Sequence, residues 1–125
     1  MNKTIFGTGI LLGVLAVILG AFGAHALEKV LSVDSLQSFE TGVRYQMYHA
    51  LLLLFLSTSS QIKEERKKLV YYLLTVGIIF FSFSIYLLAT NSLTGFNFKT
   101  IALLTPIGGT ILILGWVVLG YRTFK

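Results

Sequence analysis

Residues 4–27 read TIFGTGILLGVLAVILGAFGAHAL, a run of 24 residues without a charged side chain. An α-helix needs about 20 mostly apolar residues to cross a hydrocarbon core roughly 30 Å thick, so the run is long enough for one transmembrane helix. The whole chain has 125 residues, of which 55% are hydrophobic and only 12% are charged. Soluble domains carry about 25% charged residues. We therefore interpret the chain as a membrane protein.

Three further charge-free runs follow, over residues 45–62, 69–98 and 100–121. These runs are continuously apolar, whereas the strands of a membrane barrel alternate between apolar and polar positions, so helices are favoured. Residues 90–97 have the composition of a loop, which places the end of the third helix near Ala89. The sequence thus predicts an all-α membrane protein, one domain over 1–125, built as a bundle of four transmembrane helices at approximately 4–27, 35–62, 69–89 and 100–121.

The positions of lysine and arginine predict how this bundle is oriented. These residues gather in the cytoplasmic loops of membrane proteins. Seven of them lie in the N-terminal segment, in residues 63–68 and in the C-terminal segment, and three lie elsewhere. We expect both termini and loop 63–68 in the cytoplasm, and loops 28–34 and 90–99 on the extracytoplasmic side. The expected location is the cell (inner or plasma) membrane.

The first run also has features of a secretory signal peptide. Lys3 precedes it, and Ala24-His25-Ala26 near its end resembles a cleavage site. Signal peptides have apolar cores of about 7–15 residues, and this run is longer. We therefore favour a retained transmembrane helix over a cleaved signal.

The second helix is expected to begin before the membrane. Asp34 and Gln37 have the spacing of an N-cap and the third residue of a helix, which predicts a start near Ser35. Glu40 and Arg44 are four residues apart on this helix, a spacing that allows an ion pair.

Pro106 leaves two interpretations open for the fourth helix. It is either a first-turn proline with Thr105 as the N-cap, or a kink in a helix that starts near Thr100. The sequence does not choose between these interpretations.

Small residues recur at spacings of three and four along the first helix. In lipid, helices associate through close approach of their backbones, and small residues permit that approach. The stripe therefore predicts tight packing of another helix, either within the bundle or from a second copy. The fourth helix supplies further small residues that can meet a neighbour. The predicted packing residues are Gly9, Gly13, Ala16, Gly20, Gly23, Ala24, Gly108 and Gly109.

With this topology, polar residues of all four helices gather toward the extracytoplasmic side. Polar groups at membrane depth are costly and usually face a partner or a cavity. One interpretation is a binding pocket, and the other is a set of hydrogen bonds that fixes the bundle. The candidate cluster consists of His25, Gln46, His49, Ser82, Tyr86 and Thr105.

His25 and His49 are the candidate ligands for a haem iron or a metal ion. Two histidines alone make a poor metal site, and the nearest carboxylates, Glu28 and Glu40, belong to the loop. We therefore predict neither a metal site nor a cofactor, and keep haem or metal binding as an alternative.

The composition excludes other kinds of chemistry. The chain has no cysteine, so it forms neither disulfides nor thiolate metal sites. The net charge of +5 suggests nucleic-acid binding in a soluble protein, but in so apolar a chain we assign it to membrane orientation and expect no nucleic-acid partner. No catalytic constellation can be assembled within the spans, so we predict no catalytic residues and no enzyme.

Four segments resemble the domain-of-unknown-function 423 family, which is similar to the eukaryotic transmembrane protein 256. They are GAFGAHAL at 20–27, TGVRYQMYHAL at 41–51, FSFSIY at 81–86 and LTPIGG at 104–109, with Gly115-Trp116 following. The family pattern has a small residue where Phe83 stands. The resemblance spans nearly the whole chain and implies a four-helix membrane fold, but it brings no established activity.

The preferred hypothesis for function is a structural or lipid-interacting membrane protein that supports membrane integrity. Its expected partners are membrane lipids and a second copy of the chain in a homo-oligomer. A small-molecule or ion transporter working as an oligomer is the alternative. It is weaker because no acidic residue lies within a predicted span, where coupled carriers usually place one.

Overall fold

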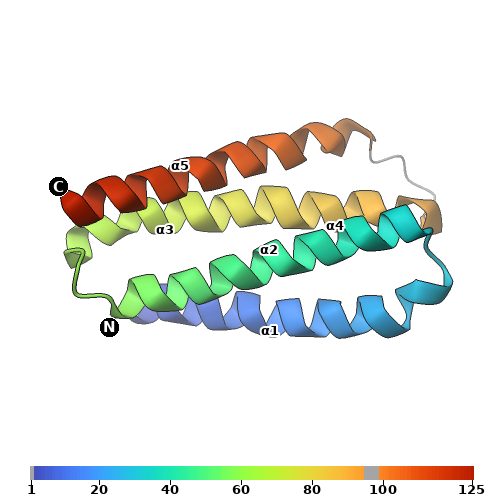
Figure 1. The fold of residues 1–125 in the computed structure, drawn as a ribbon, viewed down its shortest axis with the longest axis horizontal. Helices are drawn as coiled ribbons and strands as arrows, with labels where there is room; N and C mark the ends of the chain where they lie inside the picture. The colour runs from blue at the N-terminus through green and yellow to red at the C-terminus, as the bar shows by residue number, and fades with distance from the viewer. Residues whose placement is uncertain (1, 95–98) are drawn as a thin grey trace.

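The computed structural model describes residues 2–94 and 99–125, with the side chain of Lys99 left out. The main chain of this part is almost entirely helical, which confirms the predicted all-α class. The longer helices run antiparallel to their chain neighbours, so both termini lie at one end of the bundle (Figure 1). The α-helices are α1 (Lys3–His25), α2 (Val33–Thr58), α3 (Glu64–Ile78), α4 (Ser84–Ala89) and α5 (Leu104–Phe124).

Shorter helical pieces connect the α-helices. A π-helical segment, η2 (Ile79–Phe83), joins α3 directly to α4, so the two act as one long helix. The expected loop 90–99 contains one 3₁₀ turn and falls partly on residues 95–98, which lie outside the described residues. The 3₁₀ segments are η1 (Leu27–Lys29), η3 (Asn91–Leu93) and η4 (Lys99–Leu103).

Among the described residues, three helical segments are long and apolar enough to cross a membrane. They are Lys3–Lys29, Glu64–Ala89 and Thr100–Phe124. The helix α2 is similarly long, at 26 residues, and runs alongside the others through the bundle (Figure 1). Its mean hydropathy is lower because Arg44, Gln46 and His49 interrupt its apolar residues.

The start of α2 differs from the prediction. Its N-cap is Ser32, whose backbone is extended and whose hydroxyl accepts a 3.2 Å hydrogen bond from the Ser35 amide. Asp34 therefore lies inside the first turn and does not cap the helix. The ion pair that the spacing of Glu40 and Arg44 allows is not formed, and the Arg44 guanidinium donates instead to the Thr41 hydroxyl at 3.0 Å.

The small residues of α1 meet α2. Gly9 is buried, and a Cβ atom there would lie 2.9 Å from the carbonyl oxygen of Ala50. The two backbones thus approach too closely for a larger residue at this position. Ala16 and Gly23 are also buried, Gly13 and Gly20 are half-buried, and Ala24 is exposed.

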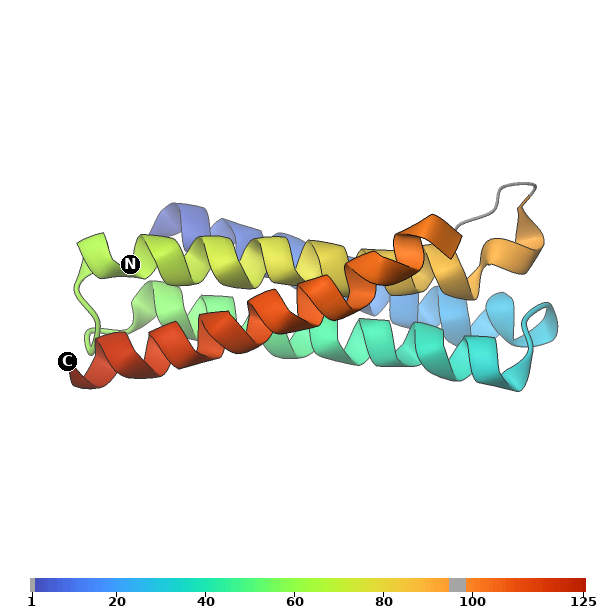
Figure 2. The same cartoon turned by 90° about the horizontal axis from the view of Figure 1, so that it is seen from above.

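The helix α5 crosses the α3–η2–α4 helix obliquely (Figure 2) and is closest to it at Gly108. A Cβ atom at Gly108 would lie 2.8 Å from the Cα atom of Phe81, so backbone meets backbone inside the π-helical segment. Pro106 is the third residue of α5, but η4 runs into α5 without a break, so the helical segment starts near Thr100, as in the second interpretation. Thr105 does not cap the helix, because no side chain does so at this start.

A buried lysine closes the end of the bundle that carries the termini. The side chain of Lys67 is only 1% exposed, and its ammonium group lies 2.7 Å from a carboxylate oxygen of Glu64. It also donates to the carbonyl oxygen of Ser57 at 3.4 Å, near the end of α2. The Asn2 amide donates to the same oxygen at 2.9 Å. One lysine thus ties α3 to α2 beside the start of α1.

Candidate functional site

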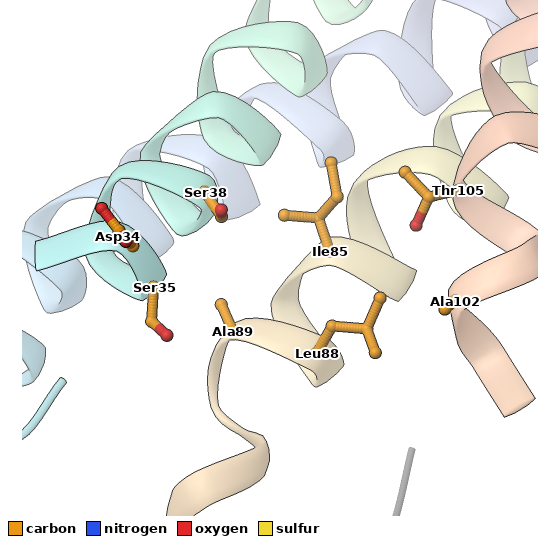
Figure 3. Close-up of a pocket in the computed structure, with 8 residues that line it drawn as sticks. All are labelled: Asp34, Ser35, Ser38, Ile85, Leu88, Ala89, Ala102 and Thr105. Carbon is orange, nitrogen blue, oxygen red and sulfur yellow. The ribbon is translucent and has the colours of Figure 1, made fainter. Parts of the chain in front are cut away.

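A cavity of about 370 Å³ opens between α2, α4 and the start of α5, at the end opposite to the termini. Figure 3 shows the polar residues of α2 on one wall, Ala102 and Thr105 on the opposite wall, and residues of α4 between them. We call this cavity the polar cleft. It is lined by Asp34, Ser35, Ser38, Ile85, Leu88, Ala89, Ala102 and Thr105.

The polar side chains on the α2 wall are not paired with other described residues. In the described part of the chain, no hydrogen bond or ion pair engages the side chain of Asp34, Ser35 or Ser38. Asp34 and Ser38 are exposed, and Ser35 is half-buried. The cleft therefore presents one carboxylate and two hydroxyl groups that are free to bind a ligand.

Thr105 behaves differently on the opposite wall. Its hydroxyl lies 2.6 Å from the hydroxyl of Ser84, which itself donates to the carbonyl oxygen of Phe81 at 2.9 Å. These bonds hold the start of α5 against α4. Thr105 therefore fixes the width of the cleft and has less capacity to bind a ligand than the serines across from it.

A buried glutamine joins three helices below the cleft. The amide nitrogen of Gln46 donates to the carbonyl oxygen of Leu12 on α1 at 2.8 Å. Its amide oxygen accepts from the hydroxyl of Tyr86 on α4 at 2.6 Å, and the residue is fully buried. Nearby, Ser82 donates to the carbonyl oxygen of Gly42 at 2.8 Å. These polar groups satisfy one another across the helices.

His49 links α2 to α5. Its Nδ1 atom lies 2.7 Å from the carbonyl oxygen of Tyr45, and its Nε2 atom accepts from the indole N–H of Trp116 at 3.1 Å. A carbonyl only accepts and an indole only donates, so this arrangement assigns the proton to Nδ1 and makes the ring neutral. Both ring nitrogens are engaged, which leaves neither free to ligate a metal.

The predicted pair of histidines does not share this site. His25 is exposed at the last residue of α1, outside the bonds that hold His49. Among the described residues, no group of three or more histidine, cysteine or acidic side chains is placed to hold a metal ion. The arrangement therefore gives no support to haem or metal binding through His25 and His49.

Five of the six predicted residues thus take part in hydrogen bonds between helices, and His25 is the exception. Sequence reasoning missed Trp116 and Ser84 as their partners. It also missed the serines of the cleft, because this stretch was interpreted only as a helix start. A usable signal was present: Asp34, Ser38, Tyr45 and His49 follow at spacings of four, seven and four, which is one face of a helix.

Residues 19–109 match a protein family described as "Protein of unknown function (DUF423)". The chain belongs to the DUF423 family. This confirms the resemblance found in the sequence. The matched residues include the whole polar cleft and the pair of Gln46 and Tyr86, together with α2, α3, η2 and α4 in full.

Relatives of this DUF423 chain are named as membrane proteins. A UPF0382 membrane protein of Staphylococcus saprophyticus is 43% identical over 94% of this chain and 93% of its own length. One from Staphylococcus aureus is 39% identical over 94% and 92%, and one from Haemophilus influenzae is 36% identical over 90% and 87%. The prediction of a membrane protein is thereby confirmed. No solved structure matches the chain.

Neither the DUF423 description nor these names state an enzymatic activity. Function must therefore be argued from the site itself.

Proposed function

We propose that this DUF423 protein is a lipid-interacting structural protein of the cell membrane, and that its polar cleft receives a phospholipid headgroup. The observation that carries the proposal is the set of unpartnered polar groups of Asp34, Ser35 and Ser38 in a cavity at one end of an apolar bundle. At the depth of lipid headgroups, such hydroxyl and carboxylate groups meet phosphate and ammonium groups as well as water.

The proposal includes a placement in the membrane. All four long helices cross it, with α2 as the fourth span because it lies alongside the others within the bundle (Figure 1). Both termini and loop 63–68 face the cytoplasm, where lysine and arginine gather. The polar cleft then lies at the extracytoplasmic side. The shared end of the termini supports an even number of crossings.

The rest of the bundle supports a structural role. Several of its polar side chains at membrane depth are paired with each other, as in Gln46 with Tyr86 and His49 with Trp116. Such bonds between helices hold a bundle together in lipid. The polar cleft differs from these pairs because its α2 wall is left open.

Native mass spectrometry of the full-length protein, gently extracted from its own membrane, tests the proposal. We expect a bound phospholipid on the wild-type protein and its loss from Ser38→Phe, which fills the cleft. Gln37→Phe is the matched control, because Gln37 is the exposed neighbour on α2 and does not line the cleft.

Equal lipid retention by Ser38→Phe and Gln37→Phe would refute the headgroup site. Loss from both variants would do the same, because binding would then not depend on the cleft. Melting curves of both variants show whether either has failed to fold. The same spectra give the number of copies in the extracted protein.

A further inference from the structure

A second cavity, of about 490 Å³, lies between α2 and α5. Tyr45 and His49 line it from α2, Phe81 lines it from η2, and Gly109 and Trp116 line it from α5. Its walls are mostly apolar and aromatic, and Tyr45 and Trp116 are 40% and 49% exposed at its edges. The cavity thus opens on the side surface of the bundle. We call it the aromatic groove.

The aromatic groove continues the polar cleft along the same helix faces. On α2, Ser38 of the cleft is followed by Tyr45 and His49 of the groove, at spacings of seven and four. On α5, Thr105 of the cleft is followed by Gly109 at a spacing of four. Residues at these spacings share one side of a helix. The two cavities therefore lie in line along one side of α2 and one side of α5, and we call this line the seam.

The floors of the two cavities also lie in line. Phe81 lines the groove and Ile85 lines the cleft, four residues further along the same helix. The rings of Phe81 and Tyr45 lie with their centroids 5.1 Å apart, which joins the floor to the α2 wall.

The seam has the length of one leaflet. From Ser38 to His49 are 11 residues, which at 1.5 Å per residue span about 16 Å of α2. Half of a hydrocarbon core roughly 30 Å thick is about 15 Å. A polar cleft above an apolar groove of this length has the proportions of one phospholipid, with its headgroup at one end and an acyl chain below it.

The charge of the cleft selects among headgroups. Asp34 is its acidic residue, and among the side chains that the structure describes no lysine or arginine lines it. A carboxylate attracts an ammonium group and repels a headgroup of net negative charge. The hydroxyls of Ser35 and Ser38 can donate to the phosphate. This combination favours a zwitterionic headgroup whose ammonium carries N–H donors.

We infer that the seam between α2 and α5 seats one ethanolamine phospholipid, with its headgroup in the polar cleft and one acyl chain in the aromatic groove. The inference rests on the proposed function and adds the class of lipid and the path of the chain. Lipid tails around the protein are as apolar as the groove, so the choice of lipid comes from the headgroup and from the fit of the chain.

Trp116 reports on the groove, because it is the one tryptophan of the chain. The experiment places the full-length protein in phosphatidylcholine vesicles with a minor, fixed fraction of lipid that carries bromine on its acyl chains. Bromine quenches indole fluorescence on contact. We expect stronger quenching by brominated phosphatidylethanolamine than by brominated phosphatidylglycerol or phosphatidylcholine at the same fraction.

A pair of glycine variants tests the path of the chain. A Cβ atom at Gly109 would lie 3.6 Å from the Phe81 ring, an ordinary contact, so Gly109→Leu enters the groove without striking backbone. Gly120→Leu is the control on the same helix, where a Cβ atom has nothing within 4 Å. We expect Gly109→Leu to lose the excess quenching by phosphatidylethanolamine and Gly120→Leu to keep it.

The outcomes separate this inference from the proposed function. Equal quenching by all three lipids would overturn the inference, while loss of lipid from Ser38→Phe in the mass spectra would still uphold the headgroup site. Excess quenching that persists in Ser38→Phe would overturn the placement of the headgroup in the cleft. Excess quenching that Gly109→Leu retains would overturn the path of the chain.

Discussion

The hydroxyl of Tyr86 donates a 2.6 Å hydrogen bond to the amide oxygen of Gln46, and the amide nitrogen of Gln46 donates to the Leu12 carbonyl oxygen. A single side chain on α2 is thus held from α4 on one side and from α1 on the other. Because Gln46 is fully buried, each of these bonds gives a hydrogen-bond partner to a polar atom that water cannot reach. The relationship makes Gln46 a link between α1, α2 and α4.

Removing the Tyr86 hydroxyl is expected to loosen this centre. Tyr86→Phe leaves the amide oxygen of Gln46 without its partner, and hydrogen bonds between membrane helices contribute about 1 kcal/mol. We expect the free energy of unfolding to fall by about that amount, measured by denaturant titration in mixed micelles. Tyr121→Phe is the control, because Tyr121 is 63% exposed. Equal stability of the two variants would show that the bond contributes nothing.

The approach of α5 to the π-helical segment predicts a strong effect at one glycine. In Gly108→Ala the new methyl group meets the backbone of Phe81, which cannot move aside as a side chain can. We expect a loss of about 2 kcal/mol, typical of an overpacked core. Gly120→Ala faces open space and should be neutral or more stable, since alanine favours helix. Thermal melting of both variants in detergent makes the comparison, and a shared melting temperature would contradict the close approach.

The bond between Trp116 and His49 predicts which nitrogen of the imidazole carries the proton. The indole donates to Nε2, so the proton must sit on Nδ1, where it meets the Tyr45 carbonyl. Nitrogen-15 NMR of histidine-labelled protein should show a neutral Nδ1–H ring for His49. In Trp116→Phe the Nε2 atom loses its donor, and its resonance is expected to shift. A neutral Nε2–H ring in the wild-type protein would rule out the bond.

The ion pair of Lys67 and Glu64 predicts unequal effects when one or the other residue is replaced. Glu64→Gln leaves a cation in the interior without its carboxylate, which is strongly unfavourable. Lys67→Met removes the charge, leaves Glu64 in water, and leaves the Ser57 carbonyl with its bond from Asn2. We therefore expect Glu64→Gln to lower the melting temperature more than Lys67→Met does. The reverse order would mean that Lys67 is not buried as described.

The helical class of the fold was predictable because a long apolar run without charge has few alternatives to an α-helix in a membrane. The N-cap of α2 was not predictable, because serine and aspartate cap helices equally well and Ser32 and Asp34 are only two residues apart. Lys67 was interpreted as one of several topological charges. Its spacings of three and seven to the buried Val70 and Leu74 placed it on the inward face of α3.

The candidate site was predicted less well than the fold. Residue types identified Gln46, His49 and Tyr86 as unusual at membrane depth. They did not predict which atoms would form hydrogen bonds with one another. Those pairings depend on the rotation of each helix, which the π-helical segment changes. Nothing in residues 79–83 marks this segment in the sequence, and the segment lies where the chain meets Gly108 on another helix.

The π-helical segment has a consequence for how this chain tolerates deletions. Such a segment holds about one residue more than an α-helix of the same rise. Loss of one residue from 79–83 would let the helix close as a regular α-helix, and the later side chains would keep nearly their present directions. Loss of one residue from α3, which is already α-helical, would instead turn every later side chain by about 100°. Tyr86 would then leave Gln46, and Ser84 would leave Thr105. The chain is therefore expected to tolerate a one-residue deletion within 79–83 better than one in α3.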